Sequence, residues 1–341
     1  MSVAAGLATI PAKTRQPRIG FAGVGWIGRH RMQAMTADER CEVIAIADPD
    51  EKVARAAHEL TSGSARICTY DELLQSGLDG IVIATPNSLH ADQTVAALEN
   101  GIAVFCQKPL GRNRSETQRV VDAARAADRL LCVDLSYRFV EGIRQIKDLV
   151  QSGALGKIYA ADLAFHNAYG PDKAWFYDAN LSGGGCLIDL GIHLVDLALW
   201  ILDFPRVTQV AGRLFSQGQR VRGRERQIED YAIGNLELEP NIAVQLACSW
   251  KAHAGCDAVI DVFFHGSQSG ARLRNVNGSF FDFVTEHFTG TRREILSVPP
   301  EEWGGRAAVD WLARLRLDNR FDPEAERLVE VSATLDRIYS S

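Results

Sequence analysis

Gly23-Val24-Gly25-Trp26-Ile27-Gly28 is the stretch of this 341-residue chain that decides the fold. It directly follows an apolar run over 18–23 and opens a helical stretch, which is the context that the pattern Gly-x-Gly-x-x-Gly requires. The first glycine permits a tight turn, the second lets a pyrophosphate approach the backbone, and the third lets helix and strand pack closely. Free N–H groups at the start of the helix attract phosphate. The stretch therefore predicts a dinucleotide-binding Rossmann domain.

The sequence downstream continues the alternation of short apolar runs and helical stretches. We expect strands over 18–23, 42–48, 80–84, 103–107 and 130–135. Ser88 is a candidate N-cap for a helix that ends at Gly101, and Ser115 precedes a second helical segment. This alternation predicts an α/β domain with a doubly wound parallel sheet over 18–139, preceded by a loose tail over 1–17.

The second half of the chain has a different pattern. After a helix over 141–151 that Gly153 ends, longer strand-like runs occupy 157–166, 206–215, 231–239, 242–250 and 258–265. Short connections between them indicate hairpins. We therefore expect residues 140–341 to form an α+β domain with a large, mainly antiparallel open sheet and helices on one face. A final amphipathic helix over 323–339 should pack back on the fold.

Composition narrows the class of partner. Hydrophobic residues make up 46% and charged residues 23% of the chain, as in soluble globular proteins, and the net charge is −6. A negative chain repels nucleic acid and anionic membranes, so a small-molecule substrate is favoured. The seven cysteines are scattered without metal-type spacing, which indicates free buried thiols in a reducing cytosol. With no signal-peptide pattern and no apolar run near membrane length, we expect a cytoplasmic protein.

Asp48 ends the second expected strand, where an acidic residue accepts hydrogen bonds from the adenosine ribose. Asp50 and Glu51 follow it, and three carboxylates would disfavour a 2′-phosphate, so NAD is favoured and NADP stays possible. Lys52 or Arg55 could soften this discrimination. The alternative for Asp48 is a loop-capping aspartate.

Two polar clusters follow later strands at the same sheet edge. Thr85-Pro86-Asn87 and His90 come after the strand over 80–84, and Asn87 or His90 could reach the nicotinamide, although a packed His90 is at least as good an interpretation. Gln107 and Lys108 end the strand over 103–107. An ammonium there could hydrogen-bond a substrate hydroxyl and stabilise oxyanion charge, and a solvated lysine is the alternative.

The third cluster lies in the second half, where Gly183-Gly184-Gly185 leads into an apolar segment over 186–202. Asp189 and His193 are four residues apart, so on a helix the carboxylate could orient the imidazole and stabilise its cation. The glycine run should turn closely around substrate or cofactor. A self-satisfied buried polar cluster fits equally well, whereas a metal site lacks further ligands and none is expected.

Taken together, these motifs in this order resemble the Gfo/Idh/MocA oxidoreductase family over nearly the whole chain. The resemblance implies hydride transfer between a nicotinamide and a sugar, polyol or sugar derivative. It implies that Lys108, Asp189 and His193 are catalytic, with His193 as the proton acceptor. It further implies a homodimer or homotetramer formed through the C-terminal sheet. The expected cofactor-binding residues are Gly23, Gly25, Trp26, Ile27, Gly28, Asp48, Thr85, Pro86, Asn87, His90, Gln107 and Lys108.

Substrate contacts are expected from the second domain and its border. Besides Asp189 and His193, the candidates are Arg138, His166, Asn167 and Tyr169, the last three in an aromatic-rich stretch that could form a cleft wall. The sequence departs from the family at Gln107, where the family has glutamate. Because neighbouring strand residues point to opposite faces, Gln107 should not contact the group that Lys108 contacts.

Two alternative functions share this fold. One is non-redox elimination or glycoside cleavage, in which bound NAD is reduced and reoxidised within one cycle. The other is a cofactor-binding regulator without catalysis, which the presence of Lys108, Asp189 and His193 disfavours.

Overall fold

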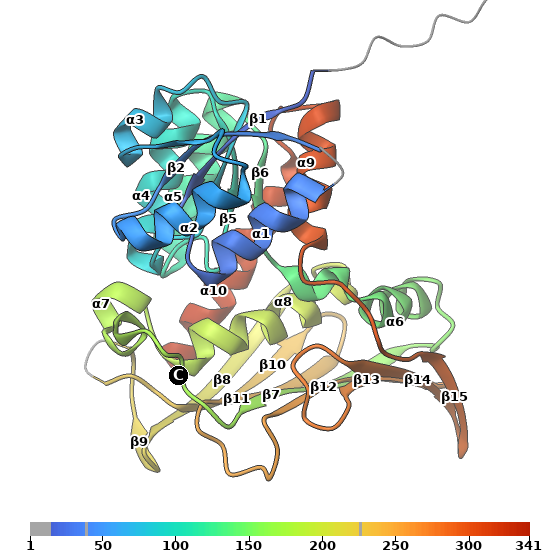
Figure 1. The fold of residues 1–341 in the computed structure, drawn as a ribbon. Coiled ribbons are helices and arrows are strands. Elements are labelled where there is room, and N and C mark those ends of the chain that lie inside the picture. Colours follow the sequence, from blue (N-terminus) through green and yellow to red (C-terminus); the bar gives the residue numbers. More distant parts are fainter. Residues whose placement is uncertain (1–14, 38–39, 225–226) are drawn as a thin grey trace, which may run out of the picture.

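The computed structural model describes residues 15–37, 40–224 and 227–341, which form two sheets with helices between and around them (Figure 1). The first sheet, near the N-terminus, is flanked by helices on both faces. The second sheet lies at the other end of the molecule. Helices α8 and α10 occupy the layer between the two sheets (Figure 1). We therefore expect a ligand-binding site at the junction between the first sheet and the second domain.

The first sheet has six parallel strands in the order β3-β2-β1-β4-β5-β6, the doubly wound order of a Rossmann domain. Its strands are β1 (Arg18–Ala22), β2 (Glu42–Ala47), β3 (Arg66–Ile67), β4 (Gly80–Ile83), β5 (Ala103–Cys106) and β6 (Leu131–Val133). Its helices are α1 (Trp26–Thr36), α2 (Glu51–Leu60), α3 (Tyr70–Leu74), α4 (Asn87–Glu99) and α5 (Arg114–Ala127). The expected fold class is confirmed, and the short β3 was not expected.

Two expected helix starts are wrong by one or two residues. The helix α4 begins at Asn87 after Pro86, so Ser88 lies inside the helix. The helix α5 is capped by Asn113, whose side chain accepts from the backbone N–H of Glu116, and Ser115 is its second residue. Asparagine is as good an N-cap as serine, which is why the local pattern allowed either. Neither shift moves the sheet edge that carries the site.

The second sheet has nine strands in the order β15-β14-β13-β12-β7-β11-β10-β8-β9. All its pairs are antiparallel except that of β7 with β11. Its strands are β7 (Ile158–Asn167), β8 (Val207–Ser216), β9 (Gln219–Val221), β10 (Tyr231–Leu238), β11 (Ile242–Ser249), β12 (Ala258–Gly266), β13 (Gly270–Asn275), β14 (Phe283–Thr289) and β15 (Arg292–Ser297). This confirms the mainly antiparallel open sheet, and adds β9, β13, β14 and β15 to the expected strands.

Helices cover the face of this sheet that looks toward the first domain, while no helix within residues 15–37, 40–224 and 227–341 lies on the opposite face (Figure 1). The helical elements of this half are η2 (Ser136–Phe139), α6 (Glu141–Gln151), η3 (Ala174–Tyr177), α7 (Ala179–Ser182), the π-helical turn η4 (Leu187–Gly191), α8 (Ile192–Ile201), α9 (Arg306–Leu317), η5 (Pro323–Glu326) and α10 (Arg327–Tyr339). The continuous helix expected over 186–202 is thus interrupted at its start by a π-helical turn.

One helical segment corrects the expectation that no apolar run approaches membrane length. Residues Ala179–Ile201 are long and apolar enough to span a membrane, but 89% of the apolar window is buried inside the fold. The burial follows from position, because α8 is packed between the second sheet and the first domain. The segment is therefore a helix of the protein core.

The chain crosses back to the first domain after the second sheet. Trp311 of α9 is fully buried against Phe105 of β5, with ring centroids 5.7 Å apart. A side chain at Gly80 would meet the Trp311 ring at 2.6 Å, so this glycine makes room for α9. The domain boundary near residue 140 stays a prediction. The helix α9 follows this boundary in the sequence but packs on the core of the first domain.

The final helix α10 packs against both domains. Leu328 contacts the core of the first domain, whereas Leu335 and Ile338 belong to the core of the second. Of the expected loose tail, residues 1–14 lie outside the described part of the chain, and Arg15 forms an ion pair with Asp79 at 2.8 Å.

The seven cysteines are all free thiols, four of them buried.

Candidate functional site

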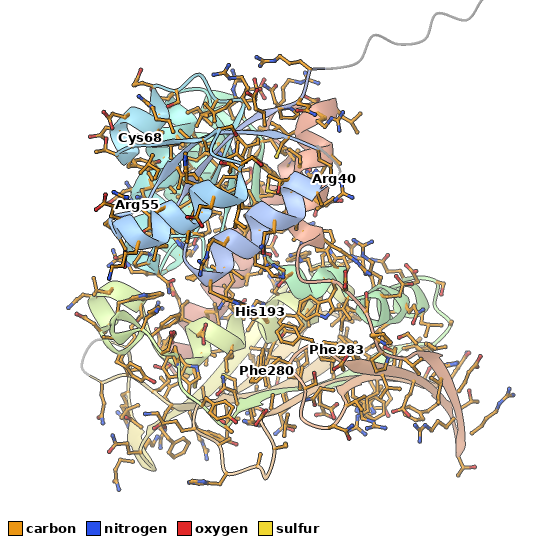
Figure 2. All side chains as sticks on the ribbon, viewed as in Figure 1. Arg40, Arg55, Cys68, His193, Phe280 and Phe283 are labelled. Carbon is orange, nitrogen blue, oxygen red and sulfur yellow. The ribbon has the colours of Figure 1, made fainter. Side chains whose placement is uncertain are left out.

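A cavity of about 1370 Å³ lies where the carboxyl edge of the first sheet faces the second domain. It is bordered by the glycine turn after β1, by the loops after β2, β4 and β5, and by His193 of α8. Figure 2 shows His193 between the two domains. Ligands of open α/β sheets bind at this edge. The site therefore combines residues from segments far apart in sequence.

The glycine turn forms a cradle that side chains would fill. Gly23 has a φ of +79°, and a Cβ there would lie 2.5 Å from the carbonyl oxygen of Ala84. A Cβ at Gly28 would lie 2.2 Å from the carbonyl oxygen of Gly23. A Cβ at Gly25 meets nothing within 4 Å, so this backbone faces open cavity. The turn fits the pyrophosphate of a dinucleotide, and Trp26, 67% exposed, stands at its rim.

Asp48 both shapes this cradle and borders the cavity. Its Oδ2 accepts from the backbone N–H of Val24 at 2.9 Å, and its Oδ1 accepts from Asp50 N at 2.9 Å. Each carboxylate oxygen keeps a second lone pair for a ribose hydroxyl. Asp50 instead caps α2 by accepting from Lys52 N and Val53 N. The ribose-binding and loop-capping interpretations of Asp48 therefore hold together.

The loop after β4 is fixed by its own side chains. Asn87 donates from Nδ2 to the carbonyl oxygen of Ser182 at 2.8 Å, which ties this loop to the second domain. The two ring nitrogens of His90 lie 2.7 Å from the carbonyl oxygens of Pro109 and Thr85. Burial lowers the pKa of His90. His90 thus holds together the loops after β4 and β5, as the packed interpretation expected.

Lys108 and Asp189 form an ion pair beside the cavity. The Lys108 Nζ lies 2.7 Å from Oδ1 of Asp189 and donates to its carbonyl oxygen at 2.8 Å. The other carboxylate oxygen, Oδ2, accepts from the indole N–H of Trp250 at 3.0 Å. Because Lys108 borders the cavity, its ammonium is held at a fixed point on the wall, with a proton free to donate to a bound ligand.

The expected contact between Asp189 and His193 is absent from the described residues, and this corrects the pairing inferred from their spacing. Asp189 lies in the π-helical turn Leu187–Gly191, whose wider winding breaks the stacking of positions four apart that an α-helix gives. Asp189 is instead engaged with Lys108 and Trp250. The carboxylate therefore positions the lysine and leaves the imidazole to other neighbours.

His193 is a buried neutral imidazole on the cavity wall. Burial, with the nearby Lys108 cation, lowers its pKa well below the ordinary value. Its Nδ1 is buried and has no hydrogen-bond partner in the described part of the chain. The ring packs against Tyr137 at 4.8 Å and Phe165 at 6.5 Å. A neutral imidazole that faces a ligand cavity can accept a proton.

Gln107 points away from Lys108, as the strand geometry predicts. Its Nε2 donates to Oδ2 of the fully buried Asp134, and Arg31 of α1 forms an ion pair with the same oxygen at 2.5 Å. An amide at position 107 is a donor to this carboxylate, where a second carboxylate would repel it. The glutamine is therefore matched to Asp134 and does not disturb the Lys108 side.

The remaining candidates lie outside the central cavity. Arg138 forms a two-pronged ion pair with the buried Asp196, at 2.9 Å and 2.5 Å. His166 borders a separate cavity of about 640 Å³, where it contacts Ser249. Asn167 accepts from Tyr169 N, and the Tyr169 hydroxyl donates to Asp257. The family resemblance places Arg138 near the substrate, the aromatic-rich stretch does so for the other three residues, and neither signal says which side of the second sheet a side chain faces.

The glycine run also lies outside the cavity lining. A Cβ at Gly184 would lie 2.1 Å from the Tyr339 hydroxyl, and one at Gly185 would lie 1.9 Å from the carbonyl oxygen of Glu229. The buried Glu229 carboxylate accepts from Gly185 N, Leu187 N and the Tyr339 hydroxyl. The glycines therefore admit α10 and β10, which corrects the expected contact with substrate or cofactor.

Sequence reasoning missed several residues of the site, among them Tyr137, Trp250, Trp303 and the Asp134–Arg31 pair. Tyr137 stands beside Arg138, which the resemblance had singled out, so this neighbourhood did carry a signal. Trp250 and Trp303 carried none, because only the tertiary fold brings Trp250 to Asp189 and Trp303 to the cavity. No group of three metal-ligating side chains occurs in residues 15–37, 40–224 and 227–341.

Comparison with known proteins agrees with this geometry. Residues 17–135 match the family described as "Oxidoreductase family, NAD-binding Rossmann fold", and residues 143–271 match the Gfo/Idh/MocA C-terminal domain. The D-glucoside 3-dehydrogenase of Escherichia coli is 29% identical over 277 residues, 77% of this chain and 78% of that protein. The dTDP-3,4-didehydro-2,6-dideoxy-α-D-glucose 3-reductase of Streptomyces violaceoruber is 36% identical over 192 residues, 55% of each chain.

Solved structures share the whole architecture. GenD2 from gentamicin A biosynthesis, in complex with NAD, superposes with a TM-score of 0.80 at 23% identity, covering 98% of this chain and 96% of that one. Levoglucosan dehydrogenase, in complex with NADH, gives a TM-score of 0.80 at 18% identity, with 95% and 96% covered. At these identities the likeness concerns the fold.

Fold, cradle and family matches define the class: this is a two-domain oxidoreductase that uses NAD or NADP. More particularly, the chain belongs to the Gfo/Idh/MocA family.

Proposed function

We propose that this protein transfers a hydride between NAD and a hydroxyl-bearing carbon of a sugar, polyol or sugar derivative. The observation that carries the proposal is the facing pair of a neutral, buried His193 and a lysine held by Asp189 on one cavity wall. Similarity to a D-glucoside 3-dehydrogenase supports the sugar class.

The cradle residues hold the cofactor in this proposal. Gly23, Gly25 and Gly28 admit the pyrophosphate, and Asp48 accepts the adenosine ribose hydroxyls. The bound nicotinamide supplies the hydride acceptor. Arg55 is paired with Glu51 and so neutralises one of the three carboxylates in this neighbourhood. The Asp48 carboxylate at the end of β2 would still repel a 2′-phosphate on the ribose that it binds, so NAD is favoured over NADP.

The chain's own residues handle the proton and the oxygen. His193 accepts the hydroxyl proton, since its neutral ring has a lone pair available at neutral pH. Lys108 donates a hydrogen bond to the reacting oxygen and stabilises the charge that develops there. Asp189 fixes the lysine through both its side chain and its carbonyl oxygen. Trp250 in turn fixes Asp189.

A screen of sugars, polyols and sugar acids for NADH formation tests this proposal, with NADP run beside NAD. We expect NADH to accumulate in proportion to substrate consumed. Substrate conversion without accumulated NADH would contradict net oxidation and favour the non-redox cycle, and NAD binding without turnover across the panel would favour a regulator.

We also infer that the protein works in the cytoplasm as a homodimer or homotetramer built through the uncovered face of the second sheet. No helix of the described residues lies over this face, which supports the oligomer (Figure 1). Light scattering on the purified chain tests it, since a monomer at micromolar concentration would contradict it.

A further inference from the structure

A row of aromatic rings leads from His193 to the mouth of the central cavity. The Tyr137 ring lies 4.8 Å from His193, Trp303 lies 5.0 Å from Tyr137, and Phe281 lies 6.4 Å from Trp303. These centroid distances are those of rings in contact. Tyr137, Trp303 and Phe281 all border the cavity, so the row forms one continuous stretch of its wall.

The outer end of this aromatic row is exposed although its sequence neighbours are packed away. Phe281 is 55% exposed, whereas Phe283 is 5% exposed and Phe280 packs against the second core. Figure 2 places Phe280 and Phe283 on the second domain beside His193. Trp303 donates from Nε1 to the carbonyl oxygen of Phe281 at 3.0 Å, which holds the loop in this position. An exposed ring fixed at a cavity mouth is a surface for a flat apolar face.

The charges beside the row are acidic or neutralised. Arg306 is paired with Glu301 and donates to the carbonyl oxygen of Phe139 at 3.1 Å. The neighbouring Glu302 is exposed and has no cationic partner in the described part of the chain, and all three residues border the cavity. A carboxylate at this place accepts hydrogen bonds from hydroxyls and repels a diphosphate.

The cavity has room for more than one small ligand. Its volume of about 1370 Å³ exceeds the usual size of a single ligand pocket, which is about 300–1,000 Å³. The cofactor cradle, the wall with Lys108 and His193, and the aromatic row each line a part of this volume.

We propose that the outer end of the aromatic row is a second subsite and that the substrate is a glycoside, with its reacting ring at His193 and an uncharged second ring on Phe281, which the buried Trp303 supports from behind. This inference rests on the proposed function. The anomeric oxygen of a glycoside is blocked, so the reaction uses a hydroxyl on another ring carbon. The C–H bond breaks with hydride going to NAD⁺, the O–H proton goes to His193, and a C=O bond forms. The product is a ketone of the intact glycoside.

The test measures kcat/KM for matched pairs, the phenyl β-glycoside and the free sugar, of glucose, galactose and mannose, with NAD saturating. We expect the best glycoside to exceed its free sugar by about tenfold, the value of one ring contact of about 1.4 kcal/mol. Phe281→Ala should remove that advantage and leave the free sugar unchanged. Ile295→Ala is the matched control, because Ile295 is 54% exposed on β15 and lies outside the cavity lining. It should change neither rate.

The outcomes separate the subsite from the function it rests on. If sugars or polyols reduce NAD but glycosides have no advantage, or if Phe281→Ala lowers both members of a pair equally, the subsite is wrong and the oxidoreductase proposal stands. If a nucleoside diphosphate sugar is preferred over the phenyl glycoside, the uncharged second ring is wrong. If no sugar, glycoside or polyol yields NADH, the oxidoreductase proposal is wrong. The subsite then stands only if phenyl glucoside binds the NADH-bound enzyme with a heat that Phe281→Ala removes, and without that heat both proposals are wrong.

Discussion

Two ion pairs, Lys108–Asp189 and Arg138–Asp196, join the first domain and its border to one helical segment of the second domain. The two aspartates are seven positions apart in this segment, and the surroundings of the two pairs differ. Lys108 and Asp189 keep side-chain exposures of 20% and 14%, and Lys108 borders the central cavity. Asp196 is only 2% exposed, and its partner Arg138 lies under the rings of Trp200 and Phe204. We call them the open pair and the closed pair. The two similar charge pairs therefore differ in access to the cavity, and we expect this access to decide which pair acts on a ligand and which one only stabilises the fold.

The largest expected effect lies beside the open pair, at His193. His193→Gln removes the proton acceptor, so kcat should fall by about 10²–10⁴-fold in the oxidation direction. The affinity for NAD, measured by fluorescence titration, should stay near that of the wild type. A variant with near-normal kcat would show that the proton leaves by another route.

The open pair itself comes next. Lys108→Met keeps the length of the side chain and removes the ammonium, so kcat/KM should fall by about 10²–10³-fold. Lys147→Met is the matched control, because Lys147 also donates to a carbonyl oxygen, that of Trp200, but lies outside the cavity. An equal loss of kcat/KM in both variants would contradict the prediction that access to the cavity distinguishes Lys108 from Lys147.

The closed pair should respond in the opposite manner. Asp196→Ala leaves the Arg138 guanidinium without its partner, so the free energy of unfolding should fall by about 3 kcal/mol or more. Chemical denaturation with urea measures this loss. The turnover number of the folded fraction should stay close to wild type. A selective loss of turnover with unchanged stability would place Asp196 in the catalytic machinery.

Trp250→Phe sharpens the comparison by removing one N–H from the open pair. Oδ2 of Asp189 then loses its donor, which costs about 1–3 kcal/mol and loosens the hold on Lys108. We expect kcat to fall while KM changes little, and the pH profile of kcat to shift. A variant altered only in melting temperature would assign Trp250 a purely structural role.

The smallest effect concerns pH. His193 has a folded-state pKa well below its unfolded value near 6.5, so the unfolded chain binds more protons as the pH falls below that value. The stability from this group is therefore complete above the unfolded pKa and declines below it, by about 1.4 kcal/mol for each pH unit until the folded pKa is reached. Urea titrations at several pH values should show a steeper decline in the wild type than in His193→Gln, because the buried His90, whose pKa is also lowered, still contributes in the variant.

The sequence predicted the cofactor half of the site better than the substrate half, for a physical reason. The glycine turn and Asp48 act through backbone geometry at the end of one strand, which a local pattern specifies. The partners of Asp189 come from residues 108 and 250, and no local rule places them together. The π-helical turn also broke the spacing rule on which the Asp189–His193 pairing depended.

The second domain shows the same limit at the level of the sheet. Alternation predicted β7, β8, β10, β11 and β12 with small errors at their ends. It could not say which face of β7 meets the first domain, so His166 and Phe165 were indistinguishable in role. In the fold Phe165 packs beside His193, and His166 borders the separate cavity on the other side.

The contact of Tyr339 with Glu229 determines when this part of the second domain can finish folding during synthesis. The Tyr339 hydroxyl completes the set of donors around a buried carboxylate that also fixes Gly185 and Leu187. The segment that carries Asp189 and His193 is synthesised well before α10, the helix that supplies this last buried partner. The packing around Glu229 can therefore be completed only after α10 has left the ribosome, and a chain truncated before Tyr339 would lack this donor.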